Sequence, residues 1–122
     1  MILADTSIWI DHLRSGNTEL SKQLGQGNVV IHPFIIAELA LGSLRERAST
    51  LALLDRLPQV RVAQTSEVRL MIESRRLYGL GIGPVDAHLI ASVFISSPTL
   101  LWTRDKALRK AAGDLGIHAD LS

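Results

Sequence analysis

The chain has 122 residues, of which 47% are hydrophobic and 20% are charged, and its formal net charge is +1. This length favours one domain with its own core, and the absence of cysteine excludes a disulfide scaffold and thiolate metal sites. The longest apolar stretches, such as LIASVFI, are too short to cross a membrane, and no basic region precedes the apolar start. We therefore expect a cytoplasmic protein.

Five short apolar segments are typical of buried strands. In chain order they are MILAD (1–5), NVVIH (28–32), VRVA (60–63), TLLWT (99–103) and IHADL (117–121). Helical patterns are found at 6–14, 33–44, 45–57, 66–79, 84–95 and 105–116. Because strands alternate with helices, the sequence predicts an α/β fold with a parallel sheet and helices on both faces.

Two acids follow predicted strands. In open parallel sheets, binding sites form at the carboxyl ends of the strands. Asp5 lies at the end of the first strand, and Asp105 follows the strand at 99–103. Either residue can also be explained as the N-cap of the next helix, which is the commoner role of a lone Asp at such a junction. The hydroxyls of Thr6 and Ser7 offer alternative caps for the first helix.

Two further acids lie on predicted helices. Glu38 has apolar neighbours in FIIAELAL, so we expect it to be partly buried, which is costly unless it is paired or binds a metal. The alternative is an edge position with its carboxylate in water or in a salt bridge to arginine. Asp86 is the third residue of a helix that begins at Pro84, where an acid also complements the helix dipole. The face of this helix that packs on the sheet is marked by Ala87, Ile90 and Ala91.

Together the four acids predict a shared site. A parallel sheet can bring Asp5, Glu38, Asp86 and Asp105 to one edge, where unpaired carboxylates repel each other and a divalent cation relieves the repulsion. Oxygen ligands suit Mg²⁺ or Mn²⁺. The chemistry that follows is metal-assisted hydrolysis of a phosphodiester, in which the metal clamps phosphate oxygens and generates a hydroxide.

Four segments resemble the motifs of the PIN-domain ribonucleases, and more narrowly those of the VapC toxins of bacterial toxin–antitoxin pairs. They are MILADTSIWIDHLR, FIIAELALGSL, GIGPVDAHLIAS and LWTRDKAL, so the resemblance covers nearly the whole chain. It implies a single PIN-like nuclease domain over residues 1–122, with three layers and a five-stranded parallel sheet in the order 3-2-1-4-5. It also implies Mg²⁺- or Mn²⁺-dependent endonucleolytic cleavage of RNA, a homodimer, and a VapB-type antitoxin that inserts a peptide into the cleft and forms a hetero-oligomer with the toxin.

The resemblance also implies roles for individual residues. The catalytic positions are Asp5, Glu38, Asp86 and Asp105, of which Asp5, Asp86 and Asp105 are metal ligands. The supporting polar positions near the metal are Thr6 and Thr103. One position departs from the family pattern: many members have Asn where Asp105 stands and an acid three residues later, where this chain has Leu108.

Two other classes of protein share parts of this pattern. A phosphorelay receiver domain also has an acidic Mg²⁺ pocket, but it needs paired acids after the first strand, whereas Asp5 stands alone. A non-catalytic interaction module would use the acids only as helix caps, and its stability should not respond to millimolar Mn²⁺.

Several other features are interpreted as structural. The four histidines, at 12, 32, 88 and 118, show no metal-ligand spacing, and Trp9 and Trp102 are expected to pack in the core. The segment TLALLDRL has more leucines than one internal face needs, which predicts that some of this surface pairs with a second copy of the chain.

Overall fold

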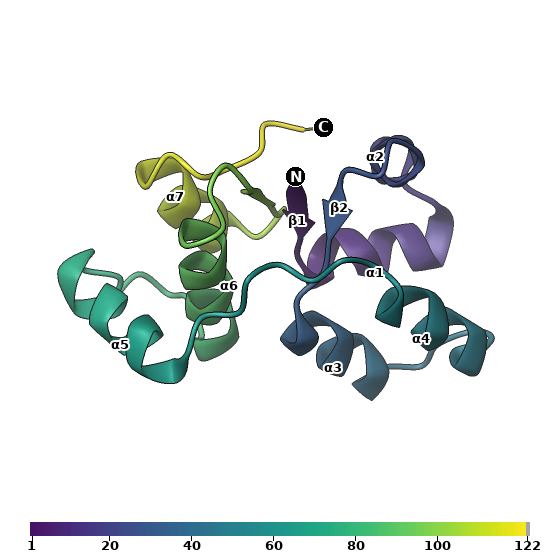
Figure 1. The fold of residues 1–122 in the computed structure, drawn as a ribbon, viewed down its shortest axis with the longest axis horizontal. Coiled ribbons are helices and arrows are strands. Elements are labelled where there is room, and N and C mark those ends of the chain that lie inside the picture. The colour runs from purple at the N-terminus through teal and green to yellow at the C-terminus, as the bar shows by residue number, and fades with distance from the viewer. Residues whose placement is uncertain (122) are drawn as a thin grey trace.

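A computed structural model describes residues 1–121; Ser122, the last residue of the predicted domain, lies outside the described residues. Within them, the chain forms three strands and seven helices, and every strand is followed by at least one helix (Figure 1). In order they are β1 (Ile2–Ala4), α1 (Thr6–Ser15), α2 (Thr18–Gly25), β2 (Val29–Val30), α3 (Pro33–Leu41), α4 (Arg47–Asp55), α5 (Thr65–Ser74), α6 (Pro84–Phe94), β3 (Leu100–Trp102) and α7 (Lys106–Asp114). The predicted α/β class is confirmed.

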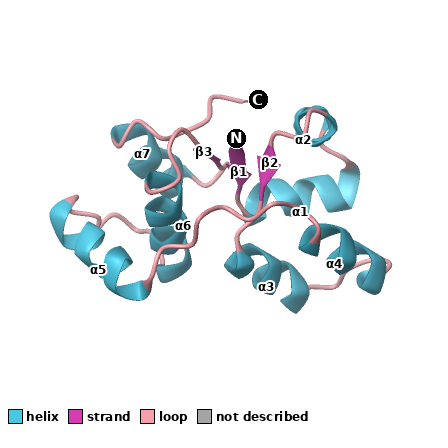
Figure 2. Ribbon diagram, viewed as in Figure 1, coloured by secondary structure: helices cyan, strands magenta, loops and turns pink. Residues whose placement is uncertain are grey.

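The three strands form one parallel sheet in the order β2-β1-β3. Ile2 pairs with Val29 on one side and with Leu100 on the other, so β1 is the central strand. In Figure 2 the short strands lie between two groups of helices, with α1 to α4 on one side and α5 to α7 on the other. Helices on both sides of a parallel sheet explain why β1 is buried along its whole length.

The predicted sheet had five strands, but among the described residues only three are formed. Next to β2, one parallel bridge joins Ile31 to Gln59, the residue directly before VRVA. Next to β3, IHADL contributes one parallel bridge, between Leu101 and His118. In VRVA, side chains from the α6 region divert the backbone donors, because the amide of Arg61 donates to Ser96 and that of Ala63 donates to Ser92. An amide that is bonded to a hydroxyl cannot extend a strand ladder.

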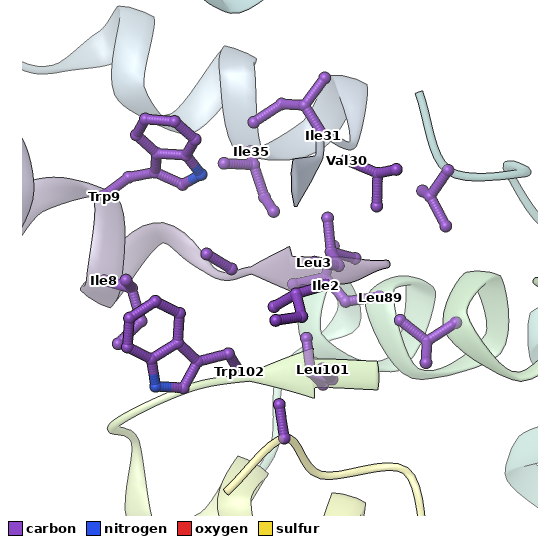
Figure 3. Packing of buried hydrophobic residues seen from close by; sticks show 14 of the residues in the cluster. Ile2, Leu3, Ile8, Trp9, Val30, Ile31, Ile35, Leu89, Leu101 and Trp102 are labelled. Atoms are coloured by element: carbon purple, nitrogen blue, oxygen red, sulfur yellow. The ribbon is translucent and has the colours of Figure 1, made fainter. Parts of the chain in front are cut away.

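The core lies around β1 (Figure 3). Leu3, Leu101 and Ile35 are fully buried there, together with side chains from α1 and α6. Both tryptophans are buried, which confirms their predicted place in the core. The predicted sheet-packing face of α6 is confirmed only for Ile90, which belongs to the core around β1, whereas Ala87 and Ala91 are buried in a smaller cluster with Val68 of α5.

Helix α2 was missing from the sequence-based prediction. Asn17 caps it by accepting a hydrogen bond from the amide of Leu20 at 2.9 Å, and Leu20 anchors the helix in the core. The signal in the sequence was this polar cap followed by apolar residues at 20 and 24. None of the described helices is long and apolar enough to cross a membrane.

Candidate active site

Asp5 occupies the junction between β1 and α1. Its Oδ1 accepts hydrogen bonds from the amide of Ile8 at 3.3 Å and from the hydroxyl of Ser7 at 2.5 Å, and its Oδ2 accepts one from the hydroxyl of Thr103. Only 5% of the residue is exposed. Burial therefore raises the pKa of Asp5, although the hydrogen bonds from Ser7 and Thr103 oppose the rise.

Thr103 connects this junction to the next one, because it directly follows β3 and is buried. Its hydroxyl donates to Asp5 and accepts a hydrogen bond from the amide of Asp105 at 3.0 Å. Asp105 in turn caps α7, since its Oδ1 accepts from the amide of Leu108 at 2.9 Å. One threonine hydroxyl thus joins the two acids that follow neighbouring strands.

Glu38 lies on α3 and is exposed, so the expectation of partial burial was wrong. The buried stripe of this helix consists of Ile35 and Leu39, and Glu38 lies beside it, as in the alternative edge position. Its Oε1 accepts a hydrogen bond from the Thr6 hydroxyl at 2.6 Å. This contact ties α3 to the first turn of α1, directly after Asp5.

Asp86 stands in the first turn of α6. Pro84 is the first helical residue, as predicted, and the Oδ2 of Asp86 accepts a hydrogen bond from the amide of Gly83 at 3.3 Å. Burial raises the pKa of Asp86, and this hydrogen bond opposes the rise. The negative charges of Asp105, Asp5 and Glu38 raise the pKa further. Each of these three acids is therefore close enough to Asp86 for its charge to act on that carboxylate.

These neighbouring acids have no cationic partner. The ion pairs of the described chain join Arg104 to Asp11 at 3.2 Å and Lys110 to Asp114 at 3.3 Å, and neither pair includes one of the four acids. Uncompensated carboxylates at one site are unfavourable without a counter-ion. The arrangement is therefore electrostatically prepared for a cation.

The donor set fits a hard divalent cation. One oxygen each of Glu38, Asp86 and Asp105 accepts a hydrogen bond, and within residues 1–121 no protein donor contacts the other oxygen. In the same part of the chain, no group of three or more His, Asp or Glu side chains is placed as a cage that could hold a metal ion. Mg²⁺ does not require such a cage, because it keeps several of its waters and uses few carboxylates.

Ser7 was not among the predicted site residues. Its hydroxyl donates to Asp5 and accepts a hydrogen bond from the amide of Arg104 at 3.3 Å. It therefore connects the start of α1 to the segment after β3, as a second link beside the one that Thr103 makes. The signal in the sequence was the Asp-Thr-Ser run, in which a hydroxyl two residues after the acid can turn back toward it.

Comparison with known proteins adds an independent line of evidence. The model of the PIN domain family matches residues 2–114, a range that contains all four acids. The chain is also similar to Ribonuclease VapC32 from two strains of Mycobacterium tuberculosis, CDC 1551 / Oshkosh and ATCC 25618 / H37Rv. Each is 45% identical over 117 residues, which cover 96% of this chain and 94% of the relative.

Proposed function

Since the chain belongs to the PIN-domain family, and within it to the VapC-type ribonucleases, we propose that its acidic site hydrolyses RNA phosphodiester bonds with the help of Mg²⁺ or Mn²⁺. The protein is thus a phosphodiester hydrolase and the toxin of a toxin–antitoxin pair. The observation that supports the proposed site is that the charges of Asp5, Glu38 and Asp105, from three other segments, act on Asp86, and that none of the four acids has a lysine or arginine partner among the described residues. The bridges at Gln59 and His118 support the five-stranded order of the family, with these segments as reduced edge strands.

The contacts of the site residues suggest a separate role for each. Asp5, Asp86 and Asp105 would hold the metal, which when bound would neutralise phosphate charge and activate a water. Thr103 holds Asp5 in place, because it donates to the carboxylate and accepts from the chain after β3. Ser7 fixes the same carboxylate from the α1 side.

Glu38 is suited to handle a proton. Its Oε1 is fixed by Thr6, while Oε2 has no donor within the described residues. A carboxylate with one oxygen held and the other free can accept a proton from an attacking water. Its exposed position on α3 allows a long substrate to reach it.

The partners follow from the same family premise. We propose RNA as substrate, a VapB-type antitoxin as inhibitor, and a homodimer as the basic assembly, in the cytoplasm. A groove of about 330 Å³, lined in part by Ile10, Leu13 and Leu39, supports a peptide partner next to α3. Exposed apolar side chains on α5 and the turn after it support a second copy of the chain.

The test is cleavage of a structured RNA by the wild type and by Asp86→Asn, with Mg²⁺ or Mn²⁺. Asn keeps the shape and can still accept the hydrogen bond from Gly83, but it removes the negative charge. Loss of a comparable electrostatic group costs about 100- to 1,000-fold in rate. The free energy of unfolding should change by about 1 kcal/mol at most, since only a helix-dipole interaction is lost.

The matched control is Asp114→Asn, which removes a surface carboxylate from α7 that pairs with Lys110. Its cleavage rate should equal that of the wild type. If Asp86→Asn also cleaved at the wild-type rate, Asp86 would be a helix-start acid only and the proposed site would be wrong.

A further inference from the structure

His32 links the two helices that carry Glu38 and Asp86. It is fully buried and directly precedes α3, where its Nδ1 accepts a hydrogen bond from the amide of Phe34 at 3.0 Å. Its Nε2 lies 3.2 Å from the hydroxyl of Ser92 on α6. Within the described residues, this is the sole hydrogen bond between the start of α3 and α6.

The chemistry of the contacts fixes the tautomer of the ring. A backbone amide can only donate, so Nδ1 carries no proton and Nε2 carries the single proton of the neutral ring. Nε2 therefore donates to the Ser92 hydroxyl, which also accepts from the amide of Ala63 at 3.0 Å. Ser92 is thus held from two sides, and it anchors His32 in one orientation.

The site needs such an anchor. Helix α3 packs mainly against α1 and α4, whereas α6 packs mainly against α5 and β3. Glu38 and Asp86 repel each other across this division. Each acid lies six residues from the contact, about 9 Å along its helix, so a small tilt at the contact would move both carboxylates.

We propose that His32 is a positioning residue for RNA cleavage: through its hydrogen bond to Ser92, it sets the position of Glu38 on α3 relative to Asp86 on α6. The proposal rests on the function proposed above. The Phe34 ring adds an apolar contact across the same boundary, since its centroid lies 5.1 Å from that of His32 and 4.8 Å from that of His88.

The test uses His32→Asn, Ser92→Ala and their double variant. Asn is a favoured N-cap, so α3 can still begin normally, but its side chain is too short to replace the contact with Ser92. The control is Val93→Ala, which removes buried volume from the next position of α6 without touching the hydrogen bond. All proteins are compared at a temperature at which circular dichroism shows each to be folded.

Two quantities are measured: kcat and KM for a structured RNA, and Mn²⁺ affinity without RNA by electron paramagnetic resonance. We expect His32→Asn and Ser92→Ala to lower kcat by about 10- to 100-fold with little change in KM, because a shift of about 1 Å in a catalytic group can reduce the rate by this factor. Mn²⁺ should bind about 10-fold more weakly, as for the loss of other groups that orient metal ligands. The double variant should be no worse than His32→Asn.

Val93→Ala should be less stable than the wild type but should keep its cleavage kinetics and its Mn²⁺ affinity. If His32→Asn and Ser92→Ala behaved like Val93→Ala, the positioning role would be overturned. A collapse of cleavage in Asp86→Asn together with normal His32→Asn and Ser92→Ala would refute the positioning role alone. Full activity in Asp86→Asn would instead refute the proposed site on which it rests.

Discussion

At the scale of single residues, helix capping and metal binding do not compete. Asp5 and Asp105 cap their helices, and Asp86 in the first turn of α6 accepts a hydrogen bond from the amide of the N-cap Gly83, so the structural explanation is correct for all three. A carboxylate has two oxygens and about four acceptor positions. In Asp86 and Asp105 one oxygen serves the helix and the other stays available.

Asp105 allows the two roles to be separated by substitution. Asn is as good an N-cap as Asp, so the free energy of unfolding of Asp105→Asn should lie within about 0.5 kcal/mol of the wild-type value. That of Asp105→Ala should be lower by about 1 kcal/mol. Both changes remove the charge, and both should lower RNA cleavage by about 100-fold. Urea unfolding and cleavage rates check the two expectations. An Asp105→Asn protein with full activity would leave Asp105 as a cap and nothing more.

His32 predicts a pH dependence of stability. Burial, with a smaller effect from the charge of His88, lowers the pKa of His32 from 6.5 to about 4. Between these values the unfolded chain binds a proton that the folded chain does not, so the contribution is fully present above pH 6.5 and is lost as the pH falls toward 4. The full loss is roughly 3 kcal/mol.

The measurement is urea unfolding from pH 7 to pH 4 in the presence of a chelator, for the wild type and for His32→Asn. The pKa values of Asp5 and Asp86 are raised, so these acids act in the opposite sense, and only the difference between the two proteins isolates the histidine. If the free energy of unfolding changed with pH in the same way in both proteins, His32 would not be the source of the pH dependence.

At the scale of elements, the sequence predicted those strands and helix starts that depend only on neighbouring residues. β1 and β3 are apolar almost throughout, and Pro84 marks the start of α6, so these features could be read from the sequence. The segment VRVA was predicted as a strand too, but the bridge falls on Gln59 before it, and hydroxyls from α6 and the turn after it accept hydrogen bonds from the amides of Arg61 and Ala63. No feature of those four residues signals this competition.

In the proposed site, too, features that depend on local sequence were predictable and features that depend on distant contacts were not. The four acids of the proposed site could be selected from the sequence, because each stands at a strand end or a helix start or within an apolar helix. The exposure of Glu38 could not be predicted, since it depends on which face of α3 meets α1. The pairing of His32 with Ser92 joins positions 60 residues apart, and neither residue belongs to a motif that would predict it.

The end of α3 supplies a prediction about an element. The guanidinium of Arg47 donates to the carbonyl oxygens of Ala40 and Gly42, which are free of helix partners at this terminus. Arg47→Ala should destabilise the protein by about 1 kcal/mol. Hydrogen exchange should become faster in the last turn of α3, with the core strands unchanged. Unaltered exchange in that turn would show that water replaces the arginine without loss.

At the scale of the whole molecule, exposed apolar residues predict the dimer. Of the α4 leucines that first suggested it, only Leu53 is largely exposed, whereas Leu70, Tyr78 and Leu80 form a longer exposed series on α5 and the turn after it. Light scattering at micromolar concentration should give twice the 13.3 kDa of the chain. Leu70→Glu should shift the mass toward the monomer, because burying a charge at an interface is unfavourable. A monomeric wild type would contradict this.

Metal binding should stabilise the whole domain if the four acids act as one site. Any ligand that binds only the folded state adds RT ln(1 + [L]/Kd) to the free energy of unfolding, about 2.7 kcal/mol at 100 times Kd. For a chain of this length, that is an increase in Tm of roughly 10 °C. Thermal unfolding with millimolar Mn²⁺ should show this increase in the wild type and in Asp114→Asn, whose altered carboxylate lies outside the site. Asp86→Asn should gain much less, because it has lost a negative ligand while its helix start is intact. Equal Tm increases in all three proteins would place the ion elsewhere, and no increase in any of them would leave the acids as helix caps.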